Sequence, residues 1–237
     1  MEFDGPLLEA RLVRRYQRFL VDVEDTQGRR WTAHCPNTGS MLGCAEPGLR
    51  VWLSHSSNAK RKYAYTWELV EVAPAVVVGV HTGRANALVG EALARGLLPG
   101  LEGYTERRRE VQVPEAPMRA DWLLDGHRDG APPCFVEVKN VTAAVTGGTA
   151  FFPDAVTERG RRHLEVLTDW IARGGRAALV FCVQRTDACS VQPAASIDPR
   201  YAAALRDAAA AGVAITAVRL RPTTTGITPE RTLPVHC

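Results

Sequence analysis

The sequence predicts an α+β protein of two domains, a small N-terminal β-barrel and a larger C-terminal α/β domain. Residues 7–80 alternate apolar and polar side chains in short runs that Gly- and Pro-containing turns separate, a pattern typical of barrels. From residue 82 onward, Ala- and Leu-rich helical segments alternate with apolar strands, which is typical of a sheet covered by helices. The chain has 237 residues, 46% of them hydrophobic, enough for two cores. We therefore place the domains at residues 1–80 and 81–237.

The first domain is expected to contain five or six short strands. Alternation predicts them at residues 7–16, 18–24, 30–35, 51–55, 63–72 and 76–80, with a turn at Gly28 between the second and third. Short strands in this number fit a small closed barrel such as an oligonucleotide-binding (OB) fold. An SH3-like barrel would produce the same pattern, so the sequence leaves both open.

The second domain begins with a helix predicted at residues 84–95, with Thr82 near its N-terminus and Gly96 beyond its end. The elements expected after it are strands at 106–113, 118–124 and 134–141, a loop at 142–150, a helix at 154–171, a strand at 176–183, a helix at 199–211 and a strand at 213–220. The first three strands should be antiparallel neighbours. The Thr- and Pro-rich tail after Pro222 is expected to be irregular.

The composition limits the function classes. A formal net charge of +3 is mildly basic, which is compatible with a nucleic-acid partner without demonstrating one. No run approaches the roughly 18 apolar residues that cross a bilayer, and the N-terminus lacks the pattern of a secretory signal. None of the six cysteines forms a Cys-x-x-Cys pair, which favours reduced thiols. We therefore expect a cytoplasmic protein without a membrane partner, and its oligomeric state is left open.

Three charged side chains on two predicted strands carry the strongest chemical signal. Asp121 lies on the strand at 118–124, and Glu137 and Lys139 lie on the strand at 134–141. Because side chains alternate along a strand, Glu137 and Lys139 point to one face while the valines beside them point into a core. Charges on such apolar strands are unfavourable unless they are paired, solvated or bound to a metal.

A divalent cation would remove the repulsion between two carboxylates on neighbouring strands, and oxygen ligands suit Mg²⁺ or Mn²⁺. We therefore predict Asp121 and Glu137 as metal ligands, with Lys139 steadying the attacking water or the transition-state charge. A simpler interpretation stays open, since Glu-x-Lys is common on half-solvated strands and Asp121 could cap a turn. The metal site is favoured by the fact that, of 29 basic residues, only Lys60, Lys62 and Lys139 are lysines.

Lys60, Arg61 and Lys62 are predicted phosphate contacts in the first domain. They lie between barrel strands just before Tyr65 and Trp67, and basic side chains interleaved with rings suit a nucleic-acid groove. The two rings could equally belong to the barrel core, since they alternate onto one face.

Further basic residues extend the predicted nucleic-acid surface. Arg15 and Arg18 add to it in the first domain. In the second domain, Arg159, Arg162 and His163 are spaced on neighbouring turns of the helix at 154–171. Together with the positive helix N-terminus they would form a phosphate-facing surface. The alternative is an ordinary amphipathic helix with a solvated basic face.

Six motifs extend over nearly the whole chain. They are RYQRF at 15–19, HCPNTG at 34–39, KRKY at 60–63, TWEL at 66–69, FVEVK at 135–139 and FPDAVTERG at 152–160, the last followed by His163 and Leu164. A chain with these motifs resembles the sugar fermentation stimulation protein A (SfsA) family. The order of helix, three strands, helix and strand, with Asp121 and Glu137-x-Lys139 on the second and third strands, also resembles the PD-(D/E)xK nuclease superfamily. Ala120 stands where that pattern often has proline.

The resemblance implies an N-terminal OB-like domain and a C-terminal restriction-endonuclease-like domain. It also implies non-specific DNA binding and a regulatory role in maltose metabolism, with Glu91 on the first helix as a third acidic metal ligand. We therefore expect a non-specific DNA-binding protein that hydrolyses phosphodiesters with Mg²⁺ or Mn²⁺. The alternative is a non-catalytic DNA-binding regulator of sugar metabolism, and RNA is also a possible partner.

Overall fold

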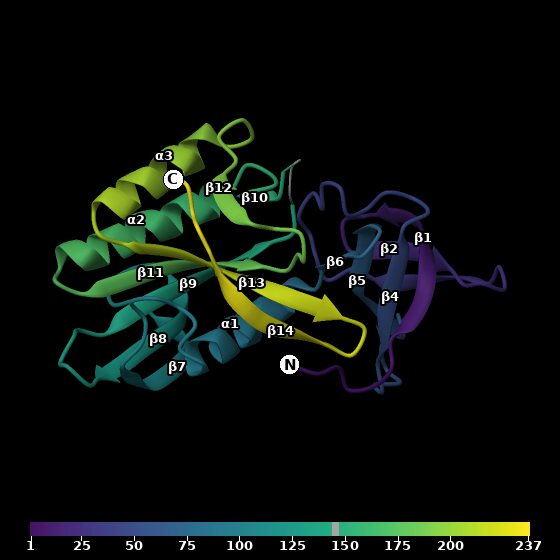
Figure 1. Ribbon diagram of the computed structural model, residues 1–237, viewed down its shortest axis with the longest axis horizontal. Helices are drawn as coiled ribbons and strands as arrows, with labels where there is room; N and C mark the ends of the chain where they lie inside the picture. Colours follow the sequence, from purple (N-terminus) through teal and green to yellow (C-terminus); the bar gives the residue numbers. More distant parts are fainter. Residues whose placement is uncertain (144–146) are drawn as a thin grey trace.

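The structure, a computed structural model, describes residues 1–143 and 147–237 and contains two β-sheet bodies that lie side by side (Figure 1). The N-terminal strands, drawn in purple and blue, form a barrel, and the teal, green and yellow part of the chain forms a sheet with helices on both faces. The predicted α+β fold class is confirmed.

Six strands form the N-terminal sheet, namely β1 (Leu8–Tyr16), β2 (Leu20–Glu24), β3 (Arg30–His34), β4 (Arg50–His55), β5 (Tyr65–Ala73) and β6 (Val76–Gly79). Their order is β3-β2-β1-β4-β5-β6, and an additional pairing of β3 with β5 closes β1 to β5 into a ring. A closed ring of five short strands is the architecture of the OB fold.

The rings of Trp67 and Tyr65, which the sequence left between the core and a nucleic-acid groove, pack in the barrel core and against it, respectively. Trp67 is fully buried, and its indole N–H donates to the Leu69 carbonyl at 2.9 Å. Tyr65 is half-buried and packs on Trp31, with 5.8 Å between the ring centroids. Trp67 is therefore a core residue and not a stacking platform for bases.

The second sheet has the order β14-β13-β11-β9-β8-β7. Its strands are β7 (Tyr104–Gln112), β8 (Arg119–His127), β9 (Cys134–Val141), β11 (Arg176–Val183), β13 (Ala214–Thr223) and β14 (Gly226–Leu233). As predicted, β7, β8 and β9 are antiparallel neighbours, whereas β9, β11 and β13 run parallel. The parallel centre is apolar on both sides because helices cover both of its faces.

A short 3-10 turn, η1 (Thr82–Arg84), leads into α1 (Ala85–Ala94), which covers one face of this sheet, while α2 (Glu158–Ala172) and α3 (Pro199–Ala210) cover the other (Figure 1). Leu88 of α1 belongs to the core cluster that also holds Val136 and Val138 of β9. Leu164 of α2 packs with Phe135 in the cluster on the opposite face. No helix of the described residues is long and apolar enough to span a bilayer.

Helix α2, strand β14 and the paired short strands β10 and β12 differ from the sequence prediction. Helix α2 begins at Glu158 and not at residue 154, because the Thr157 hydroxyl accepts from the Gly160 N–H and caps the helix there. The tail after Pro222, predicted to be irregular, forms β14 and pairs with β13. The predicted loop at 142–150 ends in β10 (Thr149–Phe152), which runs parallel to β12 (Ser190–Pro193), and residues 144–146 of that loop lie outside the described residues.

The two domains are packed together and not joined by a loose linker. Trp52 and Leu69 of the barrel belong to the buried cluster that contains α1. Asp154 of the second domain accepts from the Ser40 hydroxyl at 3.0 Å and from the Met41 N–H at 3.1 Å. The barrel loop at residues 36–41 is thereby held against the α/β domain.

Candidate metal centre and nucleic-acid interface

Asp121 and Glu137 lie opposite each other where β8 and β9 diverge. The antiparallel register pairs Trp122 with Val136, and its continuation sets Asp121 against Glu137. The ladder of paired residues ends at Trp122. Beyond it, the Val138 N–H donates to the Asp121 carboxylate at 2.7 Å and not to a carbonyl of β8. The two predicted acids are therefore neighbours at the end of a two-strand ladder.

The surroundings of Asp121 disfavour its negative charge. Burial, and then the charge of Glu137, raise the pKa of Asp121 to about 6, although hydrogen bonds from the Val138 N–H and the Asn86 amide act in the opposite direction. The Asn86 Nδ2 donates to Asp121 Oδ1 at 2.7 Å. Both direct partners of this carboxylate are thus neutral donors.

Glu137 has two basic partners and is only 4% exposed. Its Oε1 accepts from the Lys139 ammonium at 2.6 Å and lies 2.6 Å from His163 Nδ1. Because His163 Nε2 accepts from the Arg159 Nε–H at 3.3 Å, Nδ1 carries the proton and donates to Glu137. Burial opposes ionisation of Glu137, but the bond from His163 and the charge of Lys139 outweigh it and hold the Glu137 pKa below its ordinary value.

The donor set fits a hard divalent cation. Glu137 Oε2 accepts no hydrogen bond among the described residues, and Asp121 accepts one on each oxygen, which leaves lone pairs on both carboxylates. In the described part of the chain, no group of three His, Cys, Asp or Glu side chains is arranged to hold a metal ion. Two carboxylates are sufficient for Mg²⁺, which keeps several waters and takes further oxygens from substrate phosphates.

Glu91, predicted as a third metal ligand, points elsewhere. Its two carboxylate oxygens bind the N-terminal ammonium of Met1 at 2.8 and 2.9 Å. The side chain of α1 that reaches Asp121 is Asn86. The structure therefore does not support the prediction for Glu91, because α1 presents an amide and not a carboxylate to the acidic pair.

Glu110 on β7 is a neighbour that the sequence analysis missed. The β7–β8 register sets it opposite Asp121, and its Oε1 lies 3.5 Å from the Asn86 Nδ2. Its φ of 52° is in the left-handed region, which is uncommon for a residue other than glycine. Only the register across the sheet could have identified this residue, since the charged run of β7 gives no other signal.

Arg15, predicted to contact phosphate, instead binds the backbone of the barrel. Its Nη2 lies 2.8, 2.9 and 2.8 Å from the carbonyl oxygens of Arg18, Asn37 and Gly39. This guanidinium is committed to the loop, so the structure does not support a phosphate contact for Arg15. Arg18 is exposed and donates through Nε to the Thr38 carbonyl at 3.0 Å, with no other side-chain acceptor among the described residues.

Of the predicted basic segment of the barrel, the two lysines are free of hydrogen bonds from their side chains among the described residues, whereas Arg61 makes one. Lys60 and Lys62 are exposed between β4 and β5, and the Lys62 ammonium lies 5.4 Å from the centre of the Tyr63 ring. Arg61 donates from Nη2 to the Thr66 hydroxyl at 3.0 Å. The two lysines are therefore the members of this segment that can approach a phosphate without breaking a hydrogen bond among the described residues.

The three residues of the predicted basic face of α2 also differ, because Arg159 and Arg162 are exposed and His163 is buried. Arg162 is exposed and pairs with Glu158 at 3.3 Å. His163 is only 8% exposed and lies against Glu137, so it is a partner of the carboxylate and not an exposed phosphate contact. Arg159 is exposed and lines a cavity together with Lys139.

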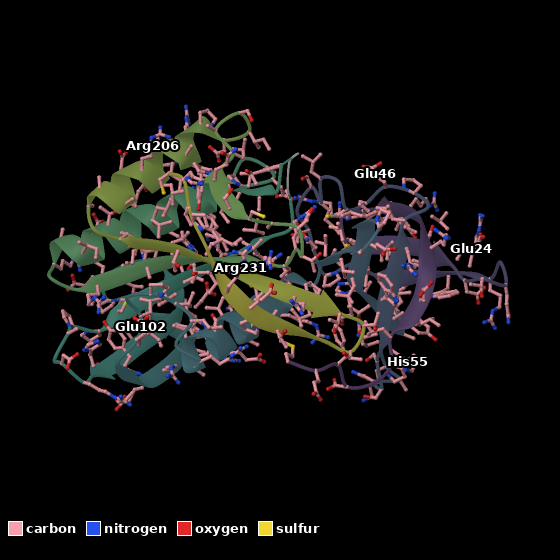
Figure 2. The ribbon with its side chains drawn as sticks, viewed as in Figure 1. Glu24, Glu46, His55, Glu102, Arg206 and Arg231 are labelled. Carbon is pink, nitrogen blue, oxygen red and sulfur yellow. The ribbon has the colours of Figure 1, made fainter. Side chains whose placement is uncertain are left out.

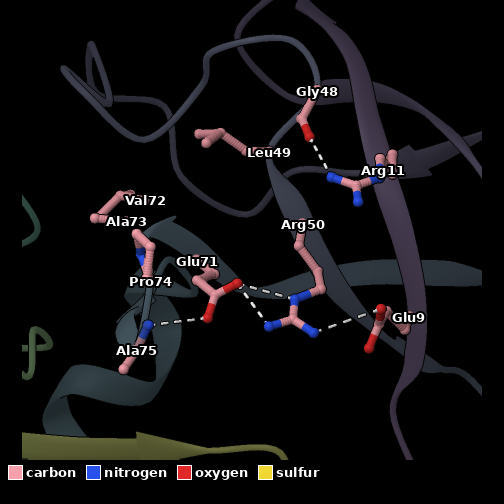
Figure 3. Close-up of a pocket in the computed structure, with 10 residues that line it drawn as sticks. All are labelled: Glu9, Arg11, Gly48, Leu49, Arg50, Glu71, Val72, Ala73, Pro74 and Ala75. Carbon is pink, nitrogen blue, oxygen red and sulfur yellow. Dashed lines mark hydrogen bonds and ion pairs between the residues drawn. The ribbon is translucent and has the colours of Figure 1, made fainter.

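Charged side chains cover both domains (Figure 2), but many of them are already neutralised. In a groove of about 690 Å³ on the barrel, Figure 3 shows Arg50 between two acids, 2.7 Å from Glu71 and 3.9 Å from Glu9. Arg11 in the same groove donates to the Gly48 carbonyl at 2.9 Å. With its charges matched in this way, the groove is a poor candidate for binding phosphate.

The fold and the carboxylate pair define a two-domain class, an OB barrel packed on an α/β domain that carries a candidate metal centre. Two family models match the chain, the "SfsA N-terminal OB domain" over residues 13–80 and the "Sugar fermentation stimulation protein RE domain" over residues 83–226. The chain belongs to the sugar fermentation stimulation protein (SfsA) family. The predicted resemblance is confirmed, and the OB fold is confirmed over the SH3-like alternative.

Relatives are similar to this chain over its whole length. The sugar fermentation stimulation protein homolog of Halorhodospira halophila is 75% identical over 236 residues, covering 100% of this chain and 98% of the relative. The homolog of Alkalilimnicola ehrlichii is 61% identical over 237 residues and covers 100% of both chains. The solved structure of Pyrococcus furiosus SfsA in complex with Ca²⁺ has a TM-score of 0.86 and 29% identity, covering 100% of this chain and 98% of that one.

Proposed function

We propose that the protein binds nucleic acid, DNA foremost, without sequence specificity and hydrolyses its phosphodiester bonds with Mg²⁺ or Mn²⁺. The observation that carries the proposal is the pair of Asp121 and Glu137, opposed on neighbouring strands, with the Lys139 ammonium bonded to one of them. A buried and a half-buried carboxylate with free lone pairs, and a lysine beside them, are the groups that metal-assisted phosphodiester hydrolysis needs.

Each side chain has a distinct role in this reaction. Asp121 and Glu137 hold the cation, which when bound polarises a phosphoryl oxygen and lowers the pKa of a coordinated water. The Lys139 ammonium has protons beyond the one it gives to Glu137, and it donates to the attacking water or to the charge that develops on the phosphate. His163 is a positioning residue, because it holds Glu137 Oε1 and leaves Oε2 for the cation.

Two further observations support the proposal. The Pyrococcus furiosus relative was solved in complex with Ca²⁺, and Ca²⁺ and Mg²⁺ are both hard cations that take oxygen ligands. Exposed Lys60 and Lys62 on the barrel, and exposed Arg18, supply positive charge for sequence-independent contacts with a phosphate backbone.

The test is incubation of purified protein with end-labelled single-stranded DNA, duplex DNA and RNA, in Mn²⁺, in Mg²⁺ and in chelator. Metal-dependent cleavage should disappear in Glu137→Gln and in Lys139→Met. Glu46→Gln is a control on the exposed barrel surface (Figure 2) and should cleave like the wild type. Binding of DNA without cleavage under any condition would refute the hydrolysis and leave the alternative, a non-catalytic DNA-binding regulator.

A further inference from the structure

A cavity of about 460 Å³ lies at the junction of the two domains, beside the carboxylate pair. The barrel loop contributes Asn37 and Thr38 to one wall, and the second domain contributes Lys139 and Arg159 to the other. The Lys139 ammonium that lines the cavity is the one bonded to Glu137. A ligand in this cavity therefore lies next to the candidate metal centre.

The barrel wall of the cavity is held in place from both sides. Arg15 binds the carbonyls of Asn37 and Gly39 from within the barrel. Asp154 accepts from the Met41 N–H from the side of the second domain. A Cβ on Gly39 would lie 2.8 Å from Asp154 Oδ2, so the loop lies close against this side chain of the second domain. The loop is thus a preorganised wall of the cavity.

Several donors at the cavity have no protein acceptor. Asn37 is only 4% exposed, and its Oδ1 accepts from the Gly39 N–H at 2.9 Å, whereas its amide N–H groups find no acceptor among the described residues. The terminal guanidinium nitrogens of Arg159 likewise have no acceptor in the described part of the chain. Asp154, an acid at the same cavity, is already bonded to the barrel loop. The amide donor of Asn37 with the cations Arg159 and Lys139 fits an anionic ligand that also accepts hydrogen bonds.

We propose that this cavity binds one unpaired nucleotide of a DNA strand, next to the phosphodiester bond that the carboxylate pair cleaves. The inference rests on the proposed function and names its substrate class. A volume of about 460 Å³ is within the range of small-ligand sites, about 300–1,000 Å³, and suits a nucleotide.

A nucleotide held in this cavity cannot at the same time stay paired in a duplex. Lys139 lines the cavity and is bonded to Glu137, so a nucleotide in the cavity brings its phosphate near the carboxylate pair. Duplex DNA is stiff over about 150 base pairs and cannot fold one of its nucleotides into a recess while that nucleotide stays paired. Enzymes that take a base into a pocket act on single strands or extrude the nucleotide from the stack. The substrate is therefore single-stranded DNA or the unpaired end of a duplex.

The first experiment compares cleavage of a single strand, a blunt duplex of the same sequence and that duplex with a single-stranded overhang, all in Mn²⁺. The single strand and the overhang should be cleaved at least about ten times faster than the blunt duplex, a factor that corresponds to about 1.4 kcal/mol in the barrier. Equal rates on the single strand and the blunt duplex would overturn the inference.

The second experiment measures binding, so that it does not depend on cleavage. Thr38→Trp places a large ring in the cavity from an exposed loop position. It should weaken binding of a labelled oligothymidylate of about 8 nucleotides, a usual site size for OB folds, by about tenfold or more in fluorescence anisotropy with Ca²⁺. Its control is Thr26→Trp, in the turn that follows Glu24. Figure 2 shows Glu24 at the end of the barrel remote from the second domain.

A charge variant provides an independent measurement. Arg159→Gln removes a cation that lines the cavity, and Arg173→Gln removes the same charge at the far end of α2. Weaker binding in Arg159→Gln but not in Arg173→Gln supports the cavity as the nucleotide site. Weaker binding in Thr38→Trp supports it as well, even if no substrate is cleaved. In that case the nucleotide site stands and only the proposed hydrolysis fails. If both cavity variants bind the single strand as tightly as their controls, the cavity is not a nucleotide site.

Discussion

Replacing Asp121 with asparagine should stabilise the metal-free protein at neutral pH, although it removes a proposed metal ligand. The rise of the Asp121 pKa from 3.8 to about 6 means that the ionised carboxyl is less favourable in the folded protein than in the unfolded chain. Since one pKa unit corresponds to about 1.4 kcal/mol, ionised Asp121 lowers the free energy of unfolding by about 3 kcal/mol. The neutral amide of asparagine avoids this cost.

The effect has a defined dependence on pH. Below about pH 4 the carboxyl is protonated in both states, so the cost is absent. Between about pH 4 and pH 6 the cost grows, because the unfolded chain ionises first, and above about pH 6 it is complete. The advantage of Asp121→Asn over the wild type should therefore rise from near zero at pH 4 to a plateau of at most about 3 kcal/mol above pH 6.

The neighbours of position 121 can accommodate the amide. Asp121 accepts from the Val138 N–H on one oxygen and from the Asn86 amide on the other. An asparagine keeps its oxygen for Val138 and turns its NH₂ to Asn86, whose own amide can rotate to present an oxygen.

Glu137→Gln is the matched control and should have the opposite sign. It deprives Lys139 and His163 of their buried carboxylate, and breaking a buried pair by removing one partner costs about 3–5 kcal/mol. Urea denaturation in chelator, between about pH 4 and pH 8, gives both differences from the midpoint and slope of each transition. An Asp121→Asn protein that is less stable than the wild type at neutral pH, with an unchanged slope, would show that the electrostatic account of the pair is wrong.

Three further predictions concern metal, DNA and the barrel. Mn²⁺ at ~100 times its dissociation constant should stabilise the wild type and Lys139→Met by about 2.7 kcal/mol but not Glu137→Gln, and a wild type with neither a thermal shift nor binding heat would refute the metal centre. The double variant Lys60→Ala/Lys62→Ala should bind DNA more weakly, with a salt slope reduced by about one for each phosphate that a lysine no longer neutralises; titrations at several salt concentrations that show no change would exclude these lysines. A fragment of residues 1–74, which retains the ring of β1 to β5, should give a β-rich circular dichroism spectrum, and a helical one would contradict the barrel.

Alternation along strands predicted most of the fold and the core of the site. Strand β9 was predicted with its observed bounds, and Glu137 and Lys139 do lie on one face of it, bonded at 2.6 Å. The same rule says nothing of register between strands, because register depends on pairing across the sheet. For this reason Glu110 was missed, although it lies opposite Asp121.

Side chains with distant partners were predicted less well. Helical spacing places His163 near Arg159, but only the packing of α2 on the sheet decides that His163 turns inward to Glu137. Arg15 and Glu91 bind loop carbonyls and the Met1 ammonium, partners that no local pattern reveals. The tail after Pro222 forms β14 because a turn at residues 224–225 returns the chain along the edge of β13, and such pairing depends on the rest of the sheet.

The close approach of Gly39 to Asp154 limits how these two domains can be recombined. The barrel loop is hydrogen-bonded to Asp154 in the segment before α2, and Trp52 of the barrel shares a core with α1. A chimera that joins the barrel of one relative to the α/β domain of another would need both sides of this junction from the same parent. In a chimera from two parents, each domain can fold while the barrel loop no longer lies correctly against the second domain. The cavity beside the carboxylate pair would then have one wall out of place. The two domains therefore have separate architectures, but one cannot be replaced by that of a relative unless the contacting residues of the other are replaced with it.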